Sequence, residues 1–183
     1  IVQVHVDHVL GNVVTVLPPG SAPRVTPRPH PVRLVPGRAM PVFDRADETA
    51  RVLAELMAHR PVVLQGPPGW GKSTMVHHVA HHPDVDAVYG AVVCLSARGY
   101  TRDDLFQALF EAFYTSDVPV RPTRVQLRHL LQAVHAVVLL DDVDLPDDAV
   151  AELAELAPNC GFVLAGVRKG PWGAAASVPL SGL

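Results

Sequence analysis

The sequence has few cysteines and few aromatic residues, and it lacks both a strong net charge and a long hydrophobic run. Its 183 residues include two cysteines and 5% aromatic residues, and the formal net charge is −3. So small a charge gives no electrostatic argument for nucleic acid or an anionic membrane as a partner. The longest apolar runs are also far shorter than a membrane span. We therefore expect no nucleic acid and no membrane among the partners.

The two cysteines, Cys94 and Cys160, lie on or beside expected strands. Both fit the pattern of small buried hydrophobic residues, which suits a reducing cytoplasm, and they imply no metal site. The chain opens at Ile1, without methionine and without a charged leader followed by an apolar core. We therefore expect a cytoplasmic fragment of a longer protein.

What the sequence does contain is a phosphate-binding loop. Residues 66–73 are Gly-Pro-Pro-Gly-Trp-Gly-Lys-Ser and match the pattern G-x-x-x-x-G-K-[ST] at every fixed position. An apolar run at 61–65 predicts a strand before the loop, and residues 73–82 predict a helix after it. The expected nucleotide-binding residues of the loop are Gly66, Pro67, Pro68, Gly69, Trp70, Gly71, Lys72, Ser73 and Thr74.

The residue types in this loop suit a nucleotide and Mg²⁺. Glycines allow a tight turn whose N–H groups, together with the helix N-terminus, point at the phosphates. Lys72 then reaches the β- and γ-phosphates as a catalytic cation, and the Ser73 hydroxyl ligates Mg²⁺. Trp70 is expected to pack or face solvent rather than stack on adenine, because loop side chains point away from the cradle. The alternative is a Gly/Pro turn before an ordinary helix.

A second motif begins at Ala136, where an unbroken apolar run ends in Asp141 and Asp142. Beside a phosphate loop, this pattern predicts a strand that carries Asp141 to the metal and Asp142, as a catalytic residue, to the attacking water. By itself, the same pattern is also a common exit from strand to loop. Asp144 fits equally well in a solvated acidic group at the start of the next helix.

The rest of the chain predicts alternating strands and helices, the pattern of a parallel sheet covered on both faces. Further strands are expected at 91–95, 136–140, 161–165 and 178–180, and helices at 46–59, 103–114, 125–134 and 147–156. The predicted fold class is α/β, a P-loop NTPase three-layer sandwich with a parallel sheet. We expect residues 42–183 to form this domain.

Two different segments precede the domain. Residues 1–17 alternate or cluster β-branched residues around Gly11-Asn12, which predicts a small β-hairpin. Residues 18–41 are rich in proline and have no periodic apolar face, so we expect an extended, mobile linker there.

Most of the segment from Val42 to Leu180 resembles the nucleotide-binding domain of STAND-class P-loop NTPases, the group of NB-ARC and NLR-like switches, especially the bacterial type. The resemblance depends on Val42 to Glu48, Ala91 to Ser96, Leu139 to Val143 and Phe162 to Arg168. Within the first of these segments, Asp44 stands where the family usually has glycine, and within the last, Ala165 and Gly166 stand where hydroxyl residues are common. The resemblance also implies that the domain at 42–183 ends before downstream helical and winged-helix regions.

The resemblance implies specific roles and partners. Arg45 would contribute to nucleotide binding, and Arg168 would sense the γ-phosphate as a catalytic residue; without the resemblance, Arg168 fits a solvated cation. The cofactors would be ATP or ADP with Mg²⁺, and hydrolysis would be slow. The module would be a regulatory switch in signal transduction or defence, acting with other domains of the full-length protein and self-associating on activation.

Other interpretations remain open. One is an AAA+ type ATPase that does mechanical work, and another is a nucleotide-binding oligomerisation module without meaningful turnover, although Lys72, Ser73 and Asp141 are intact. The base is also open, although the guanine-specific sequence N-K-x-D does not occur.

The histidines at 77, 78, 81 and 82 have the i,i+4 spacing of metal ligands. Without a nearby cysteine or carboxylate to complete a set, the spacing equally fits an ordinary helix that packs on the sheet.

Overall fold

A computed structural model of the chain describes residues 23–38, 41–166 and 175–181. Its strands are β1 (Val25–Pro27), β2 (Arg33–Leu34), β3 (Val62–Gln65), β4 (Val92–Ser96), β5 (Tyr114–Ser116), β6 (Val137–Val143), β7 (Gly161–Gly166) and β8 (Ala176–Pro179). Its helices are α1 (Ala46–Met57), α2 (Lys72–Ala80), α3 (Pro83–Val88), α4 (Arg102–Phe113), α5 (Arg124–Leu131) and α6 (Asp147–Leu156).

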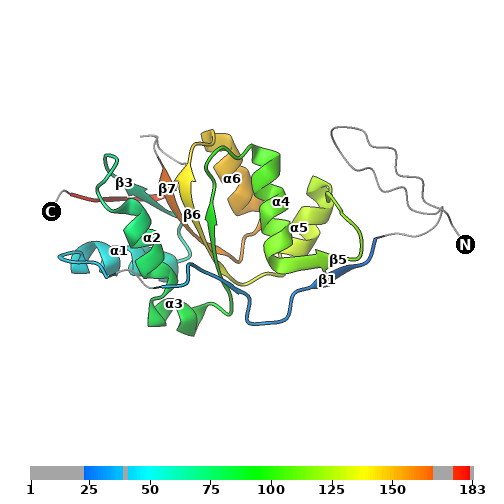
Figure 1. The fold of residues 1–183 in the computed structure, drawn as a ribbon, viewed down its shortest axis with the longest axis horizontal. Coiled ribbons are helices and arrows are strands. Elements are labelled where there is room, and N and C mark those ends of the chain that lie inside the picture. Colours follow the sequence, from blue (N-terminus) through cyan, green and yellow to red (C-terminus); the bar gives the residue numbers. More distant parts are fainter. Residues whose placement is uncertain (1–22, 39–40, 167–174, 182–183) are drawn as a thin grey trace, which may run out of the picture.

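Six strands form one sheet in the order β2-β4-β6-β7-β3-β8, and every neighbouring pair is parallel (Figure 1). The predicted α/β fold with a parallel sheet is therefore confirmed. The strands expected from the apolar runs are β3, β4, β6, β7 and β8. The carboxyl ends of β3 and β6 lie at the same edge of the sheet, so the phosphate loop and the two aspartates meet there.

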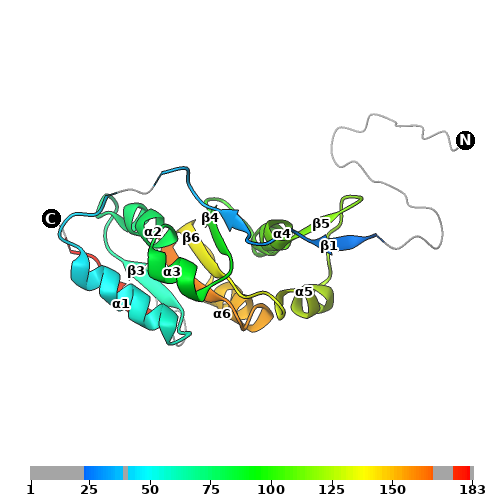
Figure 2. The ribbon, with the colours of Figure 1, turned by 90° about the horizontal axis from the view of Figure 1, so that it is seen from below.

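The sheet separates two hydrophobic cores, because successive side chains of each strand point to opposite faces. Val137 and Leu139 of β6 face a core with α1, α2 and α3, whereas Val138 and Leu140 face a core with α4, α5 and α6. Figure 2 shows these two groups of helices on opposite sides of the sheet. The continuous apolar run in β6 is thus the pattern of a strand that is buried on both faces.

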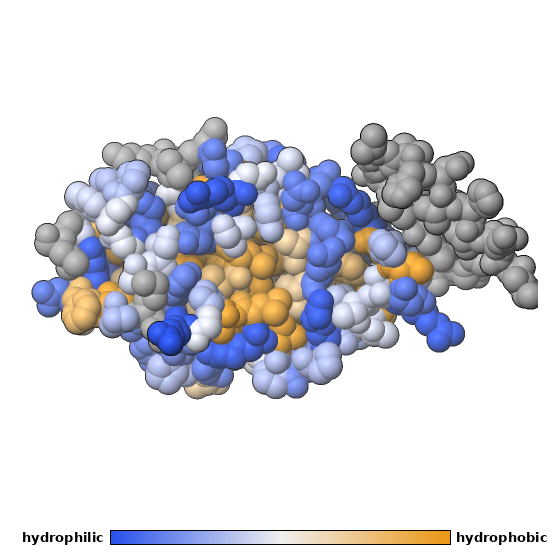
Figure 3. Space-filling model, in the orientation of Figure 1, coloured by the Kyte–Doolittle hydropathy of each residue, from blue (hydrophilic) through white to orange (hydrophobic). Residues whose placement is uncertain are grey.

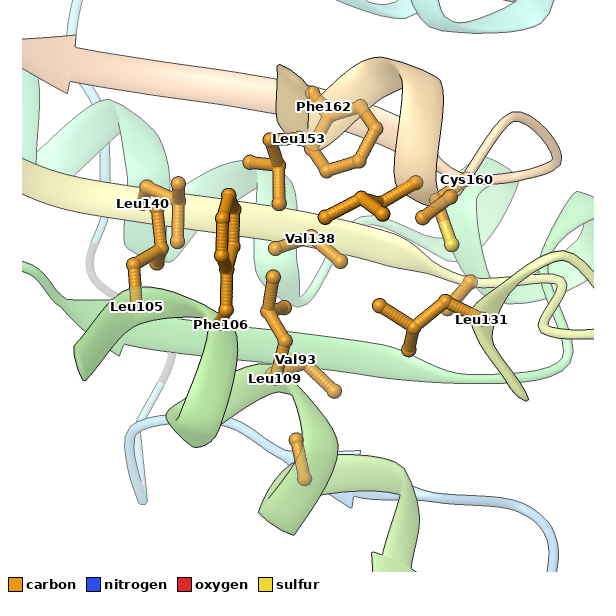
Figure 4. Packing of buried hydrophobic residues seen from close by; sticks show 14 of the residues in the cluster. Val93, Leu105, Phe106, Leu109, Leu131, Val138, Leu140, Leu153, Cys160 and Phe162 are labelled. Carbon is orange, nitrogen blue, oxygen red and sulfur yellow. The ribbon is translucent and has the colours of Figure 1, made fainter. Parts of the chain in front are cut away.

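The larger core fills the space between the sheet and α4, α5 and α6. Leu105 of α4 lies beside Leu140 of β6, and the ring of Phe106 lies between Leu140 and Val138 (Figure 4). Leu153 and Phe162 cover the same cluster from the other side. Burial of a large apolar side chain stabilises a fold by about 1.5–3 kcal/mol relative to exposure. This packing holds β6, and with it the two aspartates at its end, in a fixed position.

Local hydrogen bonds determine where two of these helices begin. The Thr101 hydroxyl accepts from the Asp104 N–H and the Asp104 side chain accepts from the Thr101 N–H, a reciprocal cap at the start of α4. Thr123 and Gln126 form the same arrangement at the start of α5. Each cap satisfies N–H groups that have no partner inside the helix.

The proline-rich segment differs from the expected mobile linker in its described part, residues 23–38. Strand β1 pairs antiparallel with β5, and β2 extends the main sheet by pairing with β4. Between them Val32 is 5% exposed in the larger core. Short strands at a sheet edge tolerate neighbouring prolines, because N–H groups on the outer side need no partner in the sheet. The absence of a periodic apolar face therefore did not exclude packing.

Two side-chain contacts fasten this segment to the first group of helices. Arg33 forms an ion pair with Asp86 of α3, and His81 Nε2 lies 2.8 Å from the Pro36 carbonyl oxygen. A space-filling view shows hydrophobic residues gathered in the middle of this face, where β2 and β4 run between the two groups of helices (Figure 3). The expected hairpin at 1–17 lies outside the described residues.

Candidate functional site

The phosphate loop connects β3 to α2 with the backbone that its sequence pattern requires. Gly69 and Gly71 have φ values of 84° and 83°, a region that favours glycine because a Cβ would be strained there. Helix α2 begins at Lys72 directly after Gly71. The N–H groups of its first turn have no partner inside the helix and, with the helix dipole, form an anion-binding end.

Lys72 lies over the loop. Its Nζ donates to the carbonyl oxygens of Gly66 at 2.6 Å and Pro67 at 3.0 Å. These two contacts hold the ammonium at the loop rather than in bulk solvent. A phosphate that entered the loop would meet this cation nearby and would replace the two carbonyl oxygens as its partner.

The two aspartates follow the apolar part of β6, where its pairing with β7 becomes irregular. The register shifts between Leu140 and Val143, and Asp142 has a φ of 54°. Its N–H donates to Asp141 Oδ1 at 2.9 Å. Such a bulge re-aims side chains at a strand end, so two adjacent carboxylates can serve one cavity.

Arg98, in the loop after β4, contacts a candidate site residue, and the sequence analysis did not single it out. Its Nε and Nη2 lie 3.2 and 2.9 Å from Asp142 Oδ2. The sequence gives no pattern for this pair, because 44 residues separate its members. The side chain of Arg98 is 80% exposed and that of Asp142 is 34% exposed. Water and salt therefore screen the pair strongly.

The loop and the aspartates enclose one cavity, which we name the phosphate-loop cavity. Its volume is about 320 Å³, and it is lined by Gly66, Pro68, Gly69, Gly71, Lys72, Ser73, Thr74, Asp141, Asp142, Ala165 and Gly166. Backbone N–H groups, an ammonium, a hydroxyl and two carboxylates are the groups that a Mg²⁺-bound triphosphate needs. The residues present fit both ligands.

A second cavity, the upstream cavity, adjoins the first. It has a volume of about 470 Å³ and is lined by Pro41, Val42, Phe43, Arg45, Gly69, Trp70, Gly71, Thr74 and Met75. Gly69, Gly71 and Thr74 line both cavities. Two of the lining residues, Phe43 and Trp70, are aromatic, and their side chains are 71% and 40% exposed.

The guanidinium of Arg45 is bonded to other groups of the protein. Its Nη1 donates to Glu48 Oε1 at 2.8 Å, and its Nη2 donates to the carbonyl oxygens of Trp70, at 3.4 Å, and of Ser181. Arg45 is 7% exposed, and a buried cation needs such partners to offset its lost hydration. Of the two cavities at the loop, it lines only the upstream one.

The remaining candidate residues either do not line the phosphate-loop cavity or lie outside the residues that the structure describes. Arg168 lies outside the described residues, although the end of β7, at Ala165 and Gly166, lines the cavity. Asp144 is exposed and does not belong to the cavity lining. Burial raises the pKa of Cys94 to about 11 and that of Cys160 to about 12.

The histidines on α2 and in the turn between α2 and α3 make separate contacts. The rings of His78 and His82 meet edge to face with centroids 5.9 Å apart, whereas His81 contacts Pro36. Burial, with a smaller contribution from His82, lowers the pKa of His78. Within residues 23–38, 41–166 and 175–181, no group of three or more His, Cys, Asp or Glu side chains could hold a metal ion.

A model of the AAA domain family matches residues 56–169, a span that contains the phosphate loop, both aspartates and the four central strands. No curated protein matches the sequence. In the part of the chain that the structure describes, none of the helices has the length and hydropathy needed to cross a bilayer.

Two solved structures resemble the chain at low identity. PCH-2 of C. elegans is 16% identical, with a TM-score of 0.46, over 76% of this chain and 44% of that one. A DNA replication initiation factor is 15% identical, with a TM-score of 0.48, over 80% of this chain and 50% of that one. The chain therefore spans about half the length of these two proteins or less.

Proposed function

This chain belongs to the AAA domain family of P-loop NTPases, and we propose that it is an ATP-binding regulatory switch that hydrolyses ATP slowly. The observation that carries the proposal is the phosphate-loop cavity, which is lined by Lys72 and Ser73 together with Asp141 and Asp142. Nucleotide and Mg²⁺ are the ligands whose charges this set of groups complements.

Each side chain has a defined task in this proposal. Lys72 exchanges the loop carbonyls for oxygens of the β- and γ-phosphates, and Ser73 and Asp141 would hold Mg²⁺. The metal supplies charge neutralisation for the triphosphate. Asp142 accepts a proton from the water that attacks the γ-phosphorus; the bond to the β–γ bridging oxygen breaks, giving ADP and phosphate. The base occupies the upstream cavity, whose apolar and aromatic lining suits a planar ring.

Hydrolysis at such a site changes the state of the module rather than a substrate protein. ATP and ADP differ in the γ-phosphate, so only groups that contact it can favour one conformation over the other. We assign the sensing of the γ-phosphate to Arg168, which follows β7 in the sequence and for which the family resemblance implies this role. The resemblance to STAND-class NTPases supports a role in signalling or defence, in which downstream domains and self-association read the nucleotide state.

Membership in the AAA domain family also supports a second function, that of an ATPase doing mechanical work. Such an enzyme would use a polar sensor side chain at the end of the strand beside the γ-phosphate. At that place, however, β7 ends in Ala165 and Gly166, which have no polar side-chain atoms. The carboxylate beside Asp141 is also an aspartate, where glutamate is usual in that class. The STAND-class strand that this segment resembles also commonly has hydroxyl residues where Ala165 and Gly166 stand, so only the aspartate at position 142 favours the switch.

Calorimetric titration with ATP and ADP tests the proposal. Lys72→Ala removes the ammonium from the phosphate loop and is expected to abolish binding or weaken it by at least about tenfold, because charge-assisted contacts contribute about 1.5–3 kcal/mol. Arg60→Ala is the matched control: it removes a cation that pairs with Glu55 at the opposite end of β3. Equal affinities for Lys72→Ala and wild type would reject the nucleotide site.

A further inference from the structure

Arg45 stands out as a buried cation that joins three separate parts of the chain. Its guanidinium bonds Glu48 in the first turn of α1, the Trp70 carbonyl in the phosphate loop and the Ser181 carbonyl after β8. A planar fork of N–H donors can satisfy acceptors in several fixed directions, which a single ammonium cannot do. Three elements therefore depend on one side chain for their relative placement.

The contact with Trp70 has a consequence for the next residue. In a trans peptide unit the C=O and the following N–H point in opposite directions. When Arg45 holds the Trp70 carbonyl on its own side, the N–H of Gly71 is turned away from Arg45. Gly71 lies between the two cavities, and Arg45 lines only the upstream one. An N–H that is turned away from Arg45 is therefore on the side of the phosphate-loop cavity, where an anion would bind.

The other contacts keep the guanidinium in place. Glu48 is 17% exposed, and its hydrogen bond to Arg45 is the main reason why its pKa is lowered, so it stays ionised. On the far side, Leu180 N–H donates to the Gln65 carbonyl at 2.7 Å, which fixes the end of β8 beside the start of the loop. Arg45 is thus anchored by an anion and by a sheet edge.

We propose that Arg45 is a positioning residue that orients the Gly71 N–H toward the phosphates. Although Arg45 lines the upstream cavity, its guanidinium donates to Glu48, Trp70 and Ser181 and supplies no hydrogen bond to the nucleotide. The proposal rests on the proposed function of the phosphate-loop cavity. It departs from the nucleotide-binding role that the family resemblance implies for Arg45. A residue that acts on the loop affects every phosphate ligand, whereas a residue that contacts the base or sugar affects only the nucleotide.

Titration of wild type and Arg45→Ala with ATP and with inorganic tripolyphosphate separates these roles. We expect both ligands to lose affinity by the same factor, about 10- to 100-fold, since one donor to a charged group is misdirected. Lost ATP affinity with unchanged tripolyphosphate affinity would overturn the proposal in favour of a nucleotide contact. Unchanged affinity for both ligands would overturn it as well.

The amide resonance of Gly71 gives a measurement that a merely structural role would leave unaltered. Tripolyphosphate should shift this resonance in wild type and leave it nearly unchanged in Arg45→Ala, while the Gly90 amide is the same in both. An equal Gly71 shift in the two proteins would refute the proposal. If the alanine variant does not fold, Arg45→Lys replaces it, because lysine keeps a cation beside Glu48 but lacks the fork.

If the proposed function itself is wrong, the same titrations give a different result. Wild type that binds neither ligand, or Lys72→Ala that binds both normally, would remove the phosphate site itself. Wild type and Lys72→Ala that behave as expected, with normal binding by Arg45→Ala, would remove only the role of Arg45.

Discussion

Replacing Arg98 with alanine tests how the Asp142 carboxylate is controlled. The guanidinium holds Asp142 Oδ2 through two contacts, at 2.9 and 3.2 Å, and the Arg98 side chain is 80% exposed. Exposed ion pairs contribute about 0.2–1 kcal/mol. If the pair restrains the carboxylate that acts on water, its loss should raise ATP turnover by at most about fivefold, which is the rate equivalent of about 1 kcal/mol.

The same energy limits the effect on stability. A loss of up to about 1 kcal/mol lowers the melting temperature of a chain of this size by about 2–4 °C. Phosphate release at saturating ATP and Mg²⁺ measures the turnover, and a thermal melt measures the stability. Arg60→Ala is the control, because it breaks another exposed pair, with Glu55, and should change the melt slightly and the turnover not at all.

One result would refute this reasoning directly. A decrease in turnover of more than about tenfold in Arg98→Ala, with a normal melt, would mean that Arg98 assists the reaction and does not restrain Asp142. Unchanged turnover would mean that the ion pair has no influence on the carboxylate during the reaction.

Three further outcomes are expected. Asp141→Asn should lose the Mg²⁺ dependence of ATP affinity, whereas Asp142→Asn should keep binding and lose turnover; equal behaviour in paired binding and hydrolysis assays would reject this division. Gly71→Ala should cost about 1–2 kcal/mol in denaturant unfolding because its φ is 83°, whereas Gly90→Ala, in open space at an ordinary φ, should be near neutral. The pKa of His78 is lowered from 6.5, chiefly by burial, so the folded state binds fewer protons and stability should fall as the pH drops below about 6.5; His78→Gln should reduce that fall in pH-dependent melts.

Local patterns in the sequence were sufficient for most of the fold. Uninterrupted apolar runs predicted the five longer strands of the sheet, and helical periodicity predicted α1, α2, α4, α5 and α6. Helix α3 and strand β5 were not expected, because six and three residues are too few to show a period. The same limit applies to β1 and β2, whose prolines favoured a linker.

The candidate site, too, could be predicted only in part from local sequence patterns. The phosphate loop and the pair Asp141 and Asp142 were visible in the sequence, because their chemistry requires fixed residue types at fixed spacing. The roles predicted for individual site residues stay predictions. The pairing of Asp142 with Arg98 was not visible, since no local pattern connects residues in different loops.

The sequence by itself determined the longer strands and helices and the position of the phosphate-loop motif, because both depend on residues that are neighbours along the chain. Tertiary structure alone decided that β2 lies beside β4 and that Arg45 reaches Ser181, 136 residues away. A buried cation can be paired only by groups that the folded chain brings to it, and strand order depends on how the helices pack on both faces. The sequence motif around Arg45 implied a nucleotide contact, whereas the folded chain pairs its guanidinium with Glu48, Trp70 and Ser181.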